Sequence, residues 1–291
     1  MTGAETPTGP ALPRTIDDVP GWFFRADQEA FSWFLDRQTE AGVTGNLLEL
    51  GTYLGRSAIL LGRHLRSGET FTVCDLFDSE APDDENSAEM SMSYRDSLTR
   101  RAFEANYLAF HEELPTVVQA PTSVLADGRI PTASCRFVHV DASHLYEHVA
   151  GDIQVAREAL SKDGLVALDD YRSEHTPGVA AAVWEAVFDH GLRPVLLTPS
   201  KFYGTWGDAD SLIRDFLARD WRAEGFRMDS EIIGGHTCYR LAWDDPVPSP
   251  QRRPAPQRSA SRRLALAVLP PVVTKAVRRQ LQASRDRRAA H

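Results

Sequence analysis

The sequence predicts an α/β fold in which a mainly parallel sheet is covered by helices on both faces. Short apolar runs alternate along the chain with segments of helical periodicity, as expected for repeated strand–helix units. A glycine turn follows the first apolar run, and clusters of polar residues follow two of the later ones. Right-handed crossovers bring the carboxyl ends of such strands to one edge of the sheet, where ligands bind in open α/β folds.

The individual elements follow from this periodicity. Strands are expected at residues 46–50, 70–74, 117–119, 136–140, 165–168, 194–198 and 236–243. Helices are expected at residues 27–39, 57–65, 101–110, 149–160, 178–190 and 210–221. Pro177 stands just before the fifth of these helices, where proline favours helix initiation.

Three segments fall outside the alternating pattern and set the domain boundaries. Residues 1–20 are polar and proline-rich, so we expect a flexible leader before a single domain at residues 21–245. Residues 78–100 are acidic and polar and are expected to be an insert, either a lid over a ligand or a surface loop. Residues 246–291 are rich in Pro, Arg and Ala, which indicates a largely disordered basic tail.

Composition excludes several classes of protein. The chain has 291 residues, 42% hydrophobic and 25% charged, which suits a globular protein with one large domain. Its three scattered cysteines form no CxxC pair, so neither a disulfide scaffold nor a structural zinc site is expected. No apolar run approaches the roughly 20 residues that a membrane span needs, and the N-terminus lacks a secretory apolar region. We therefore expect a cytoplasmic protein.

Charge is distributed unevenly. From Gln251 to His291 the chain has eleven Lys or Arg against one acid, so the rest is strongly acidic under a total net charge of −9. An acidic body is not expected to bind nucleic acid, because basic side chains supply most of that affinity. The tail has two interpretations: contact with an anionic membrane surface or nucleic acid, or a solvated extension without function. A homo-oligomer remains an open expectation.

The turn from Glu49 to Ser57 is the first motif that indicates a ligand-binding site. It reads Glu-Leu-Gly-Thr-Tyr-Leu-Gly-Arg-Ser, and Tyr53 stands where a dinucleotide-binding turn has its second glycine. The bulky Tyr53 side chain argues against binding of NAD or FAD, whose pyrophosphate needs a glycine at this position. Asp75 ends the second expected strand, 24 residues after Gly51, where a carboxylate commonly accepts hydrogen bonds from ribose hydroxyls. Together these residues predict a nucleoside site; the alternative is a tight turn followed by a helix-capping Asp75.

With this acid-x-Gly-x-x-x-Gly turn, the chain from about Pro20 to Trp243 resembles the class I S-adenosylmethionine-dependent methyltransferases. It is most similar to their metal-dependent small-molecule O-methyltransferases of the sugar and catechol types. The resemblance implies a Rossmann-like sheet of seven strands with an antiparallel last strand, which residues 236–243 would supply. The cofactor it implies is S-adenosyl-L-methionine.

The resemblance also implies a set of cofactor-binding residues. Gly51 and Gly55 would lie beside the methionine part of the cofactor, and Asp75 would hold the ribose. The family usually places Gly-Asp-Ser against the adenine; here only Ser123 matches, because Pro121 and Thr122 replace the other two. The full expected set is Glu49, Gly51, Tyr53, Gly55, Ser57, Asp75 and Ser123.

Carboxylates follow the fourth and fifth expected strands. Asp141 follows one strand, and Asp169 and Asp170 follow the other, so three like charges meet at one edge of the sheet. Without a cation, one of them should have a raised pKa; with Mg²⁺ or a similar hard ion the repulsion is relieved. The resemblance places a metal site on these three residues. The alternative is that Asp169 and Asp170 cap the next segment.

Asp141 and His144 are the candidate catalytic residues. The pattern Asp141-x-x-His144-x-Tyr146 resembles the sugar O-methyltransferases. Methyl transfer to a hydroxyl requires loss of its proton, and an unperturbed imidazole titrates near neutral pH, so His144 is the expected base. The alternative is that His144 is a packing residue.

The remaining histidines and the candidate acceptor residues follow from their positions. His139 is expected inside the fold and His148 on a helix surface. Side chains expected near the mouth of the site, where aromatics could stack on an acceptor, are Tyr171, Arg172, Lys201, Phe202, Tyr203 and Trp206.

The predicted function is methyl transfer from S-adenosylmethionine to a hydroxyl of a small molecule of the sugar or natural-product type, assisted by Mg²⁺. Two alternatives remain at this point. One is a metal-independent methyltransferase of the same fold, and the other is a non-catalytic nucleoside-binding protein.

Overall fold

A computed structural model describes residues 12–80 and 98–243. The first eleven residues of the expected leader, most of the expected lid insert and the whole basic tail therefore lie outside the described residues. Where the expected leader is described, it contains a short 3₁₀ helix, η1 (Ile16–Asp18).

All the helices and strands expected within the described residues are present. The helices are α1 (Arg25–Glu40), α2 (Arg56–Arg63), α4 (Arg100–Leu108), α5 (Tyr146–Ala159), α6 (Pro177–Phe188) and α7 (Ala209–Ala218), with a 3₁₀ helix η2 (Thr122–Asp127). The strands are β1 (Asn46–Leu50), β2 (Phe71–Asp75), β3 (Thr116–Gln119), β4 (Cys135–Val140), β5 (Leu160–Leu168), β6 (Arg193–Leu197), β7 (Phe202–Thr205), β8 (Arg227–Ile233) and β9 (His236–Ala242).

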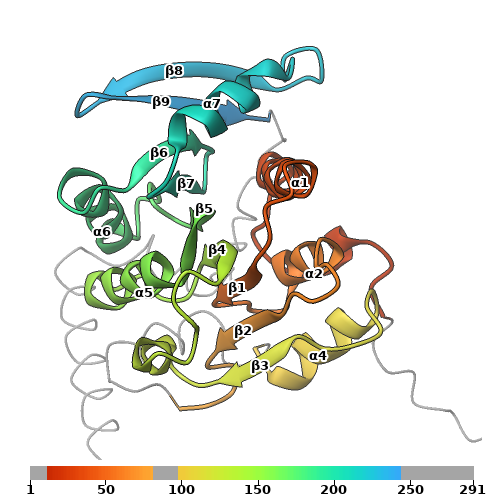
Figure 1. Cartoon of the computed structure of the whole chain (residues 1–291). Coiled ribbons are helices and arrows are strands. Elements are labelled where there is room, and N and C mark those ends of the chain that lie inside the picture. The colour runs from red at the N-terminus through yellow and green to blue at the C-terminus, as the bar shows by residue number, and fades with distance from the viewer. Residues whose placement is uncertain (1–11, 81–97, 244–291) are drawn as a thin grey trace, which may run out of the picture. The chain divides into compact units, whose positions relative to one another are not determined.

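The strands form one mainly parallel sheet in the order β3-β2-β1-β4-β5-β7-β6-β9-β8 (Figure 1). Strands β3, β2, β1, β4 and β5 pair in parallel, and β7 lies antiparallel between β5 and β6. The predicted fold class is confirmed. Within the described residues the sheet has nine strands rather than seven, because β7 and β8 are present in addition to the expected strands.

One strand assignment needs correction. The last strand, β9, was expected to be the antiparallel strand of the sheet, but it pairs in parallel with β6. The antiparallel strand between β5 and β6 is β7, which the sequence analysis did not predict. Its four residues are all buried, so they show no polar–apolar alternation, and the short connection from β6 reverses the chain direction.

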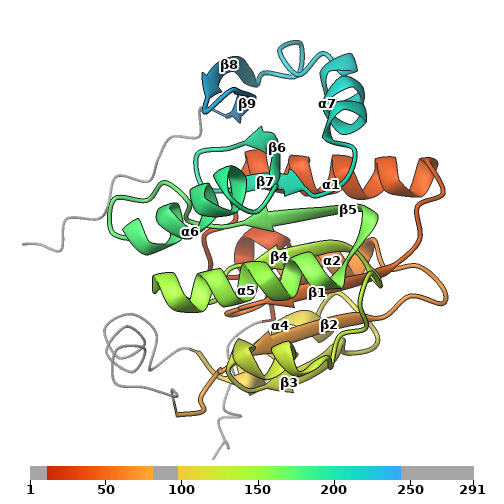
Figure 2. The same cartoon turned by 60° about the vertical axis from the view of Figure 1, so that its left-hand side comes forward.

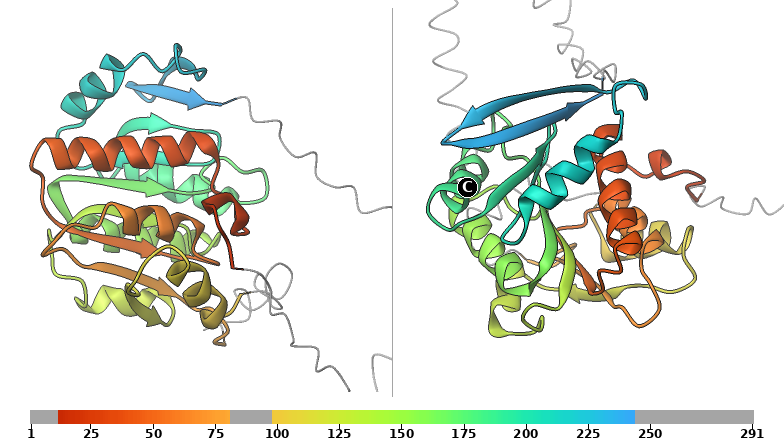
Figure 3. Two further views of the ribbon diagram at one scale, coloured as in Figure 1. Left: turned by 90° about the vertical axis from the view of Figure 1, so that its right-hand side faces the viewer. Right: turned by 45° about the horizontal axis from the view of Figure 1, so that its top comes forward.

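Helices cover the two faces of the sheet as predicted (Figures 1 and 2). Helices α1, α2, α4 and α7 contribute to one apolar core, and α5 and α6 contribute to the other. Neighbouring strand residues alternate between the cores: Leu47 belongs to the first, and Leu48 and Leu50 to the second. Figure 3 (left) shows α1 lying along the first of these faces.

Strand register aligns the ends of β1, β4 and β5, so the candidate site residues that follow them lie at the same edge of the sheet. Leu50 of β1 pairs with Val140 of β4, and Val140 pairs with Leu168 of β5. The residues that follow, beginning with Gly51, Asp141 and Asp169, therefore leave the sheet side by side at its carboxyl edge.

The segment before α1 is fastened to α2 by one side chain. The Arg56 guanidinium donates hydrogen bonds to the carbonyl oxygens of Ile16 (3.2 Å), Asp17 (2.6 Å) and Gly21 (3.0 Å). These contacts hold the described end of the expected leader against the helix that follows the glycine turn.

Candidate functional site

A cleft of about 950 Å³ opens along the carboxyl edge of the sheet. Its walls come from the segments that follow β1, β2, β3, β4 and β5, from the first half of α5, and from residues 20–24 before α1. This is the size of cleft that holds a small-molecule ligand.

The glycine turn after β1 brings two parts of the edge into contact. Gly51 has φ +77°, and a Cβ at this position would lie 2.1 Å from the carbonyl oxygen of Asp141. Only glycine fits such a close approach. The carboxylate of Asp75 accepts hydrogen bonds from the backbone N–H groups of Thr52 (2.7 Å), Tyr53 (2.9 Å) and Phe77 (2.7 Å). Asp75 therefore supports the turn as well as facing the cleft.

The structure brings most of the expected cofactor-binding residues together. Glu49 and Gly55 do not line the cleft: Glu49 is fully buried inside β1, and Gly55 packs against the ring of Phe103. The expected residues that do line it are Gly51, Tyr53, Ser57, Asp75 and Ser123.

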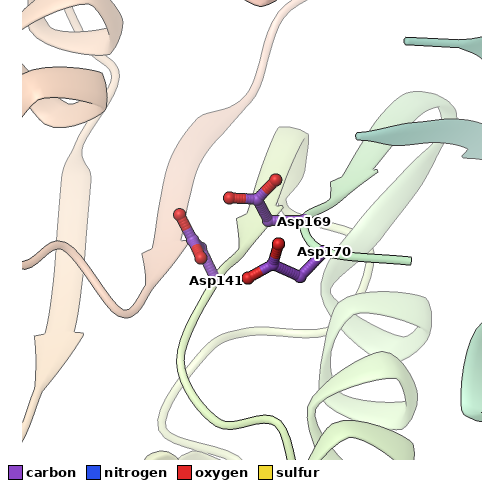
Figure 4. Close-up of side chains that lie close together, drawn as sticks. All are labelled: Asp141, Asp169 and Asp170. Carbon is purple, nitrogen blue, oxygen red and sulfur yellow. The ribbon is translucent and has the colours of Figure 1, made fainter. Parts of the chain in front are cut away.

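Three carboxylates meet after β4 and β5 (Figure 4). One oxygen from each of Asp141, Asp169 and Asp170 lies within 4.8 Å of the others. The Oδ1 atom of Asp169 is buried and has no hydrogen-bond partner within residues 12–80 and 98–243. Removal from bulk water, together with the neighbouring Asp169, raises the pKa of Asp141 well above its usual range. A raised pKa in this cluster was expected from the sequence.

A buried lysine faces this cluster. Lys201 follows β6 and is 1% exposed, and its Nζ lies 2.8 Å from Asp169 Oδ2 and 3.7 Å from Asp141 Oδ2. Burial alone would lower the pKa of Lys201, but the surrounding carboxylates outweigh it and raise the pKa. Lys201 lines the cleft as expected from its position in the sequence, but its role as a counterion was not predicted. Nothing in the local sequence indicates that role, which depends on the pairing of β7 with β5.

Lys201 also joins a buried chain of polar groups. Its Nζ lies 3.0 Å from His139 Nε2, and His139 Nδ1 lies 2.8 Å from Glu49 Oε1. Because an ammonium only donates, His139 accepts at Nε2 and donates from Nδ1 to Glu49. Burial, with the charge of Lys201, lowers the pKa of His139 well below its usual range, so the ring is neutral. The expected burial of His139 is confirmed.

Glu49 makes the stability of the fold depend on pH. Burial raises its pKa from 4.5 to about 7, so the folded state holds the proton more tightly than the unfolded state does. The resulting stabilisation is complete below pH 4.5 and is lost as the pH rises through 7. Glu49→Gln removes this loss while retaining a hydrogen-bond acceptor for His139. We expect denaturant unfolding to show the variant gaining up to about 3 kcal/mol over the wild type between pH 5 and pH 8. A pH-independent difference would contradict this assignment.

His144 lies beside the acid cluster and contacts one member of it. Its Nε2 is 3.1 Å from Asp170 Oδ2, and Ser173 Oγ donates to Asp170 Oδ1 at 2.5 Å. Burial would raise the pKa of Asp170, but the hydrogen bonds from His144 and Ser173 outweigh it and lower the pKa. His148, on α5, is half-buried and lies 3.2 Å from Ser143 Oγ through its Nδ1.

The aromatic wall of the cleft differs from the one expected. Phe202 and Tyr203 are fully buried in β7, and Tyr171 is buried with its hydroxyl donating to the carbonyl of Thr198. Arg172 and Trp206 do not line the cleft either. The aromatic side chains that do line it, which the sequence analysis missed, are Trp22, Phe23, Phe24 and Tyr53. The Trp22 and Tyr53 rings lie 5.6 Å apart.

Two expectations from composition can be compared with the structure. Cys74, Cys135 and Cys238 are all free and buried. Within the described residues, no helix combines the length and apolar character required to cross a membrane.

A family described as a methyltransferase domain matches residues 48–171. This range holds the glycine turn, Asp75, His144 and the acid cluster, on the parallel part of the sheet. Residues 48–171 are therefore similar to a methyltransferase domain, and the mainly parallel sheet agrees with the fold that the sequence resemblance implies.

Several solved methyltransferase structures are similar to this chain. The O-methyltransferase NovP is 20% identical, with a TM-score of 0.49 over 62% of this chain and 79% of that one. The calicheamicin methyltransferase CalS11 is 18% identical, with a TM-score of 0.46 over 66% of this chain and 84% of that one. An O-methyltransferase from Bacillus cereus in complex with SAH is 16% identical, with a TM-score of 0.43 over 65% and 84%. No curated protein sequence matches the chain.

Proposed function

We propose that the chain is an S-adenosylmethionine-dependent methyltransferase that transfers a methyl group to a hydroxyl of a small molecule of the sugar or natural-product type. One observation carries the proposal: a single cleft is lined by the glycine turn, Asp75, the acid cluster and His144. A nucleoside donor and a hydroxyl acceptor therefore have adjacent places on one edge of the sheet.

The donor is assigned to the half of the cleft next to β1 and β2. Gly51 lines this half of the cleft, and the methionine part of the cofactor would lie beside the backbone of its turn. Asp75 Oδ2 already accepts hydrogen bonds from the N–H groups of Thr52 and Tyr53, whereas Oδ1 accepts one from Phe77 and can accept a second, here from a ribose hydroxyl. The sulfonium would then point toward the segments after β4 and β5.

Proton removal is assigned to His144. Its Nε2 lies 3.1 Å from Asp170 Oδ2, and the Asp170 carboxylate would stabilise the imidazolium that forms when His144 takes the proton. As the acceptor oxygen attacks the methyl carbon, the bond from carbon to sulfur breaks and the hydroxyl proton passes to His144. The cleft contributes proximity and alignment of the two reactants.

The acid cluster fits a divalent metal. Asp141, Asp169 and Asp170 offer three carboxylates, and Asp169 Oδ1, which has no hydrogen-bond partner in the described part of the chain, could coordinate a cation. When bound, Mg²⁺ would lower the pKa of a coordinated hydroxyl and orient it.

A second candidate, a metal-independent methyltransferase, is favoured by one observation. Lys201 already supplies a positive charge to Asp169 and Asp141. In that case the carboxylates would position the acceptor through hydrogen bonds, and His144 would act without a metal. A non-catalytic nucleoside-binding protein is less consistent with the pairing of His144 and Asp170 inside the same cleft.

Calorimetric titration distinguishes these three candidate functions. Chelator-treated protein is titrated with S-adenosylhomocysteine and then, with that nucleoside bound, with Mg²⁺. Binding of both supports the proposal and justifies a screen of hydroxyl acceptors. Nucleoside binding without a metal effect supports the metal-independent enzyme or a binding protein, which the acceptor screen then distinguishes. Absence of nucleoside binding overturns the proposal.

Asp170→Asn is the cleanest test of the metal site. Asp170 has φ +55°, a left-handed conformation that Asn tolerates and Ala does not, so the variant changes charge without adding backbone strain. We expect Mg²⁺ affinity to fall at least about tenfold while the melting temperature stays close to that of the wild type. Asp163→Asn, an exposed change on β5, serves as the control. Unchanged Mg²⁺ affinity in Asp170→Asn would remove Asp170 from the ligand set.

A further inference from the structure

One buried carboxylate in the cleft has no part in the function proposed above. Asp152 lies on α5, is 2% exposed and lines the cleft. Its Oδ2 atom is buried and has no hydrogen-bond partner in the part of the chain that the structure describes. A buried carboxylate oxygen without a donor is costly, so a protein that retains one usually provides a donor from a ligand or from water.

The position of Asp152 along the cleft indicates which part of a ligand it meets. The sheet order β3-β2-β1-β4-β5 places the segment after β3 at one end of the cleft and the acid cluster at the other. Asp152 hydrogen-bonds with the side chain of Thr122 in η2, which follows β3, so Asp152 belongs to the end away from the acid cluster. With the methyl group near His144 and the ribose near Asp75, the base of the nucleoside lies at this end.

The chemistry of the surrounding wall favours one type of base. Ala120, Pro121 and Val155 give apolar surface against which a planar ring can pack, and Thr122 and Ser123 bring hydroxyls. A hydroxyl both donates and accepts, so it does not select between an amino and an oxo group. Asp152 brings a carboxylate to this end of the cleft, and an ionised carboxylate only accepts hydrogen bonds. Burial raises the pKa of Asp152 to about 7, against a hydrogen bond from Thr122 that lowers it, so the group is ionised at pH 8.5, the pH of the titrations described below.

We propose that Asp152 is the residue that selects adenine, by accepting a hydrogen bond from its 6-amino group. This inference rests on the proposed function, because it assumes that a nucleoside occupies the cleft. A hypoxanthine base carries an oxygen at the same position, which would face the carboxylate as a second acceptor and be rejected. Asp152 is thus a specificity-determining residue, separate from the acid cluster that serves the reaction.

The test compares two ligands that differ at the 6-position of the base. Wild-type protein is titrated calorimetrically at pH 8.5 with S-adenosylhomocysteine and with S-inosylhomocysteine, in which oxygen replaces the amino group. We expect the adenine compound to bind at least about tenfold more tightly. In Asp152→Asn the amide can turn either its oxygen or its nitrogen toward the base, so the ratio should fall below about threefold.

Two controls isolate the effect of Asp152. Glu158→Gln changes an exposed carboxylate on the same helix and should leave the ratio at the wild-type value. Ser123→Ala removes a hydroxyl from the same end of the cleft and should also preserve the ratio, whatever it does to affinity. Because each ratio is measured within one variant, partial unfolding changes the number of sites and not the ratio.

The outcomes separate this inference from the proposed function. Equal binding of the two compounds by the wild type overturns the role of Asp152 and leaves the methyltransferase proposal intact, and this comparison requires no variant. A wild-type ratio that persists in Asp152→Asn means that Asp152 has only a structural role beside Thr122. Failure of the wild type to bind either compound overturns both proposals.

Discussion

Lys201→Met is expected to lower the free energy of unfolding by about 3–5 kcal/mol, the usual cost of removing one partner from a buried ion pair. The Lys201 ammonium is 2.8 Å from Asp169, which is itself buried, and the charge of Asp27 also stabilises it. Methionine fills similar space but leaves these carboxylates without a counterion. Urea unfolding at pH 7.5 measures the change.

A matched lysine and a double variant make this prediction specific. Lys162→Met alters an exposed lysine of β5 and should change stability by less than about 0.5 kcal/mol. Adding Asp169→Asn to Lys201→Met removes one of the uncompensated charges and should restore part of the lost stability. Equal unfolding midpoints for Lys201→Met and Lys162→Met would show that the ammonium is not the counterion of the cluster.

His144→Gln is expected to lower kcat for methyl transfer by about 10²–10⁴-fold, the range typical of a lost general base. Glutamine retains a donor for Asp170 at similar reach but has no atom that can take the proton. Binding of S-adenosylhomocysteine should be unaffected, because the nucleoside is assigned to the other side of the cleft. Kinetics with an acceptor found by screening, together with calorimetry, measure the two effects.

His148→Gln is the matched control for that variant. His148 also lines the cleft but contacts Ser143 rather than the acid cluster, so its kcat should stay within about threefold of the wild type. Should His144→Gln retain wild-type kcat while His148→Gln loses it, the roles of the two histidines would have to be exchanged.

The features predicted correctly from the sequence are those set by local pattern. Apolar runs and helical periodicity were sufficient for the alternating strands and helices, because the helices bury one face and the central strands are buried on both faces as continuous apolar runs. The clustering of Asp141, Asp169 and Asp170 followed from strand order alone, since residues after parallel strands share an edge.

The features that were missed depend on contacts between distant segments. β7 is fully buried and β8 is mostly exposed, so neither strand shows the alternation that marks a half-buried strand. The Gly234-Gly235 turn between β8 and β9 has positive φ at both positions and is a typical hairpin signal that was overlooked. Lys201 and Asp152 are surrounded in sequence by ordinary residues, and only the tertiary packing shows that both are buried in the cleft wall.

The attachment of residues 16–21 through Arg56 has a consequence for how acceptor preference can change. The wall formed by Trp22, Phe23 and Phe24 comes from outside the sheet, whereas the assigned donor and proton-transfer groups follow strand ends within it. Exchanging this short aromatic segment while keeping Arg56 would therefore alter the shape offered to an acceptor and leave the reacting groups in place. The segment that would contact an acceptor can therefore be redesigned separately from the strand ends that carry the groups assigned to the reaction.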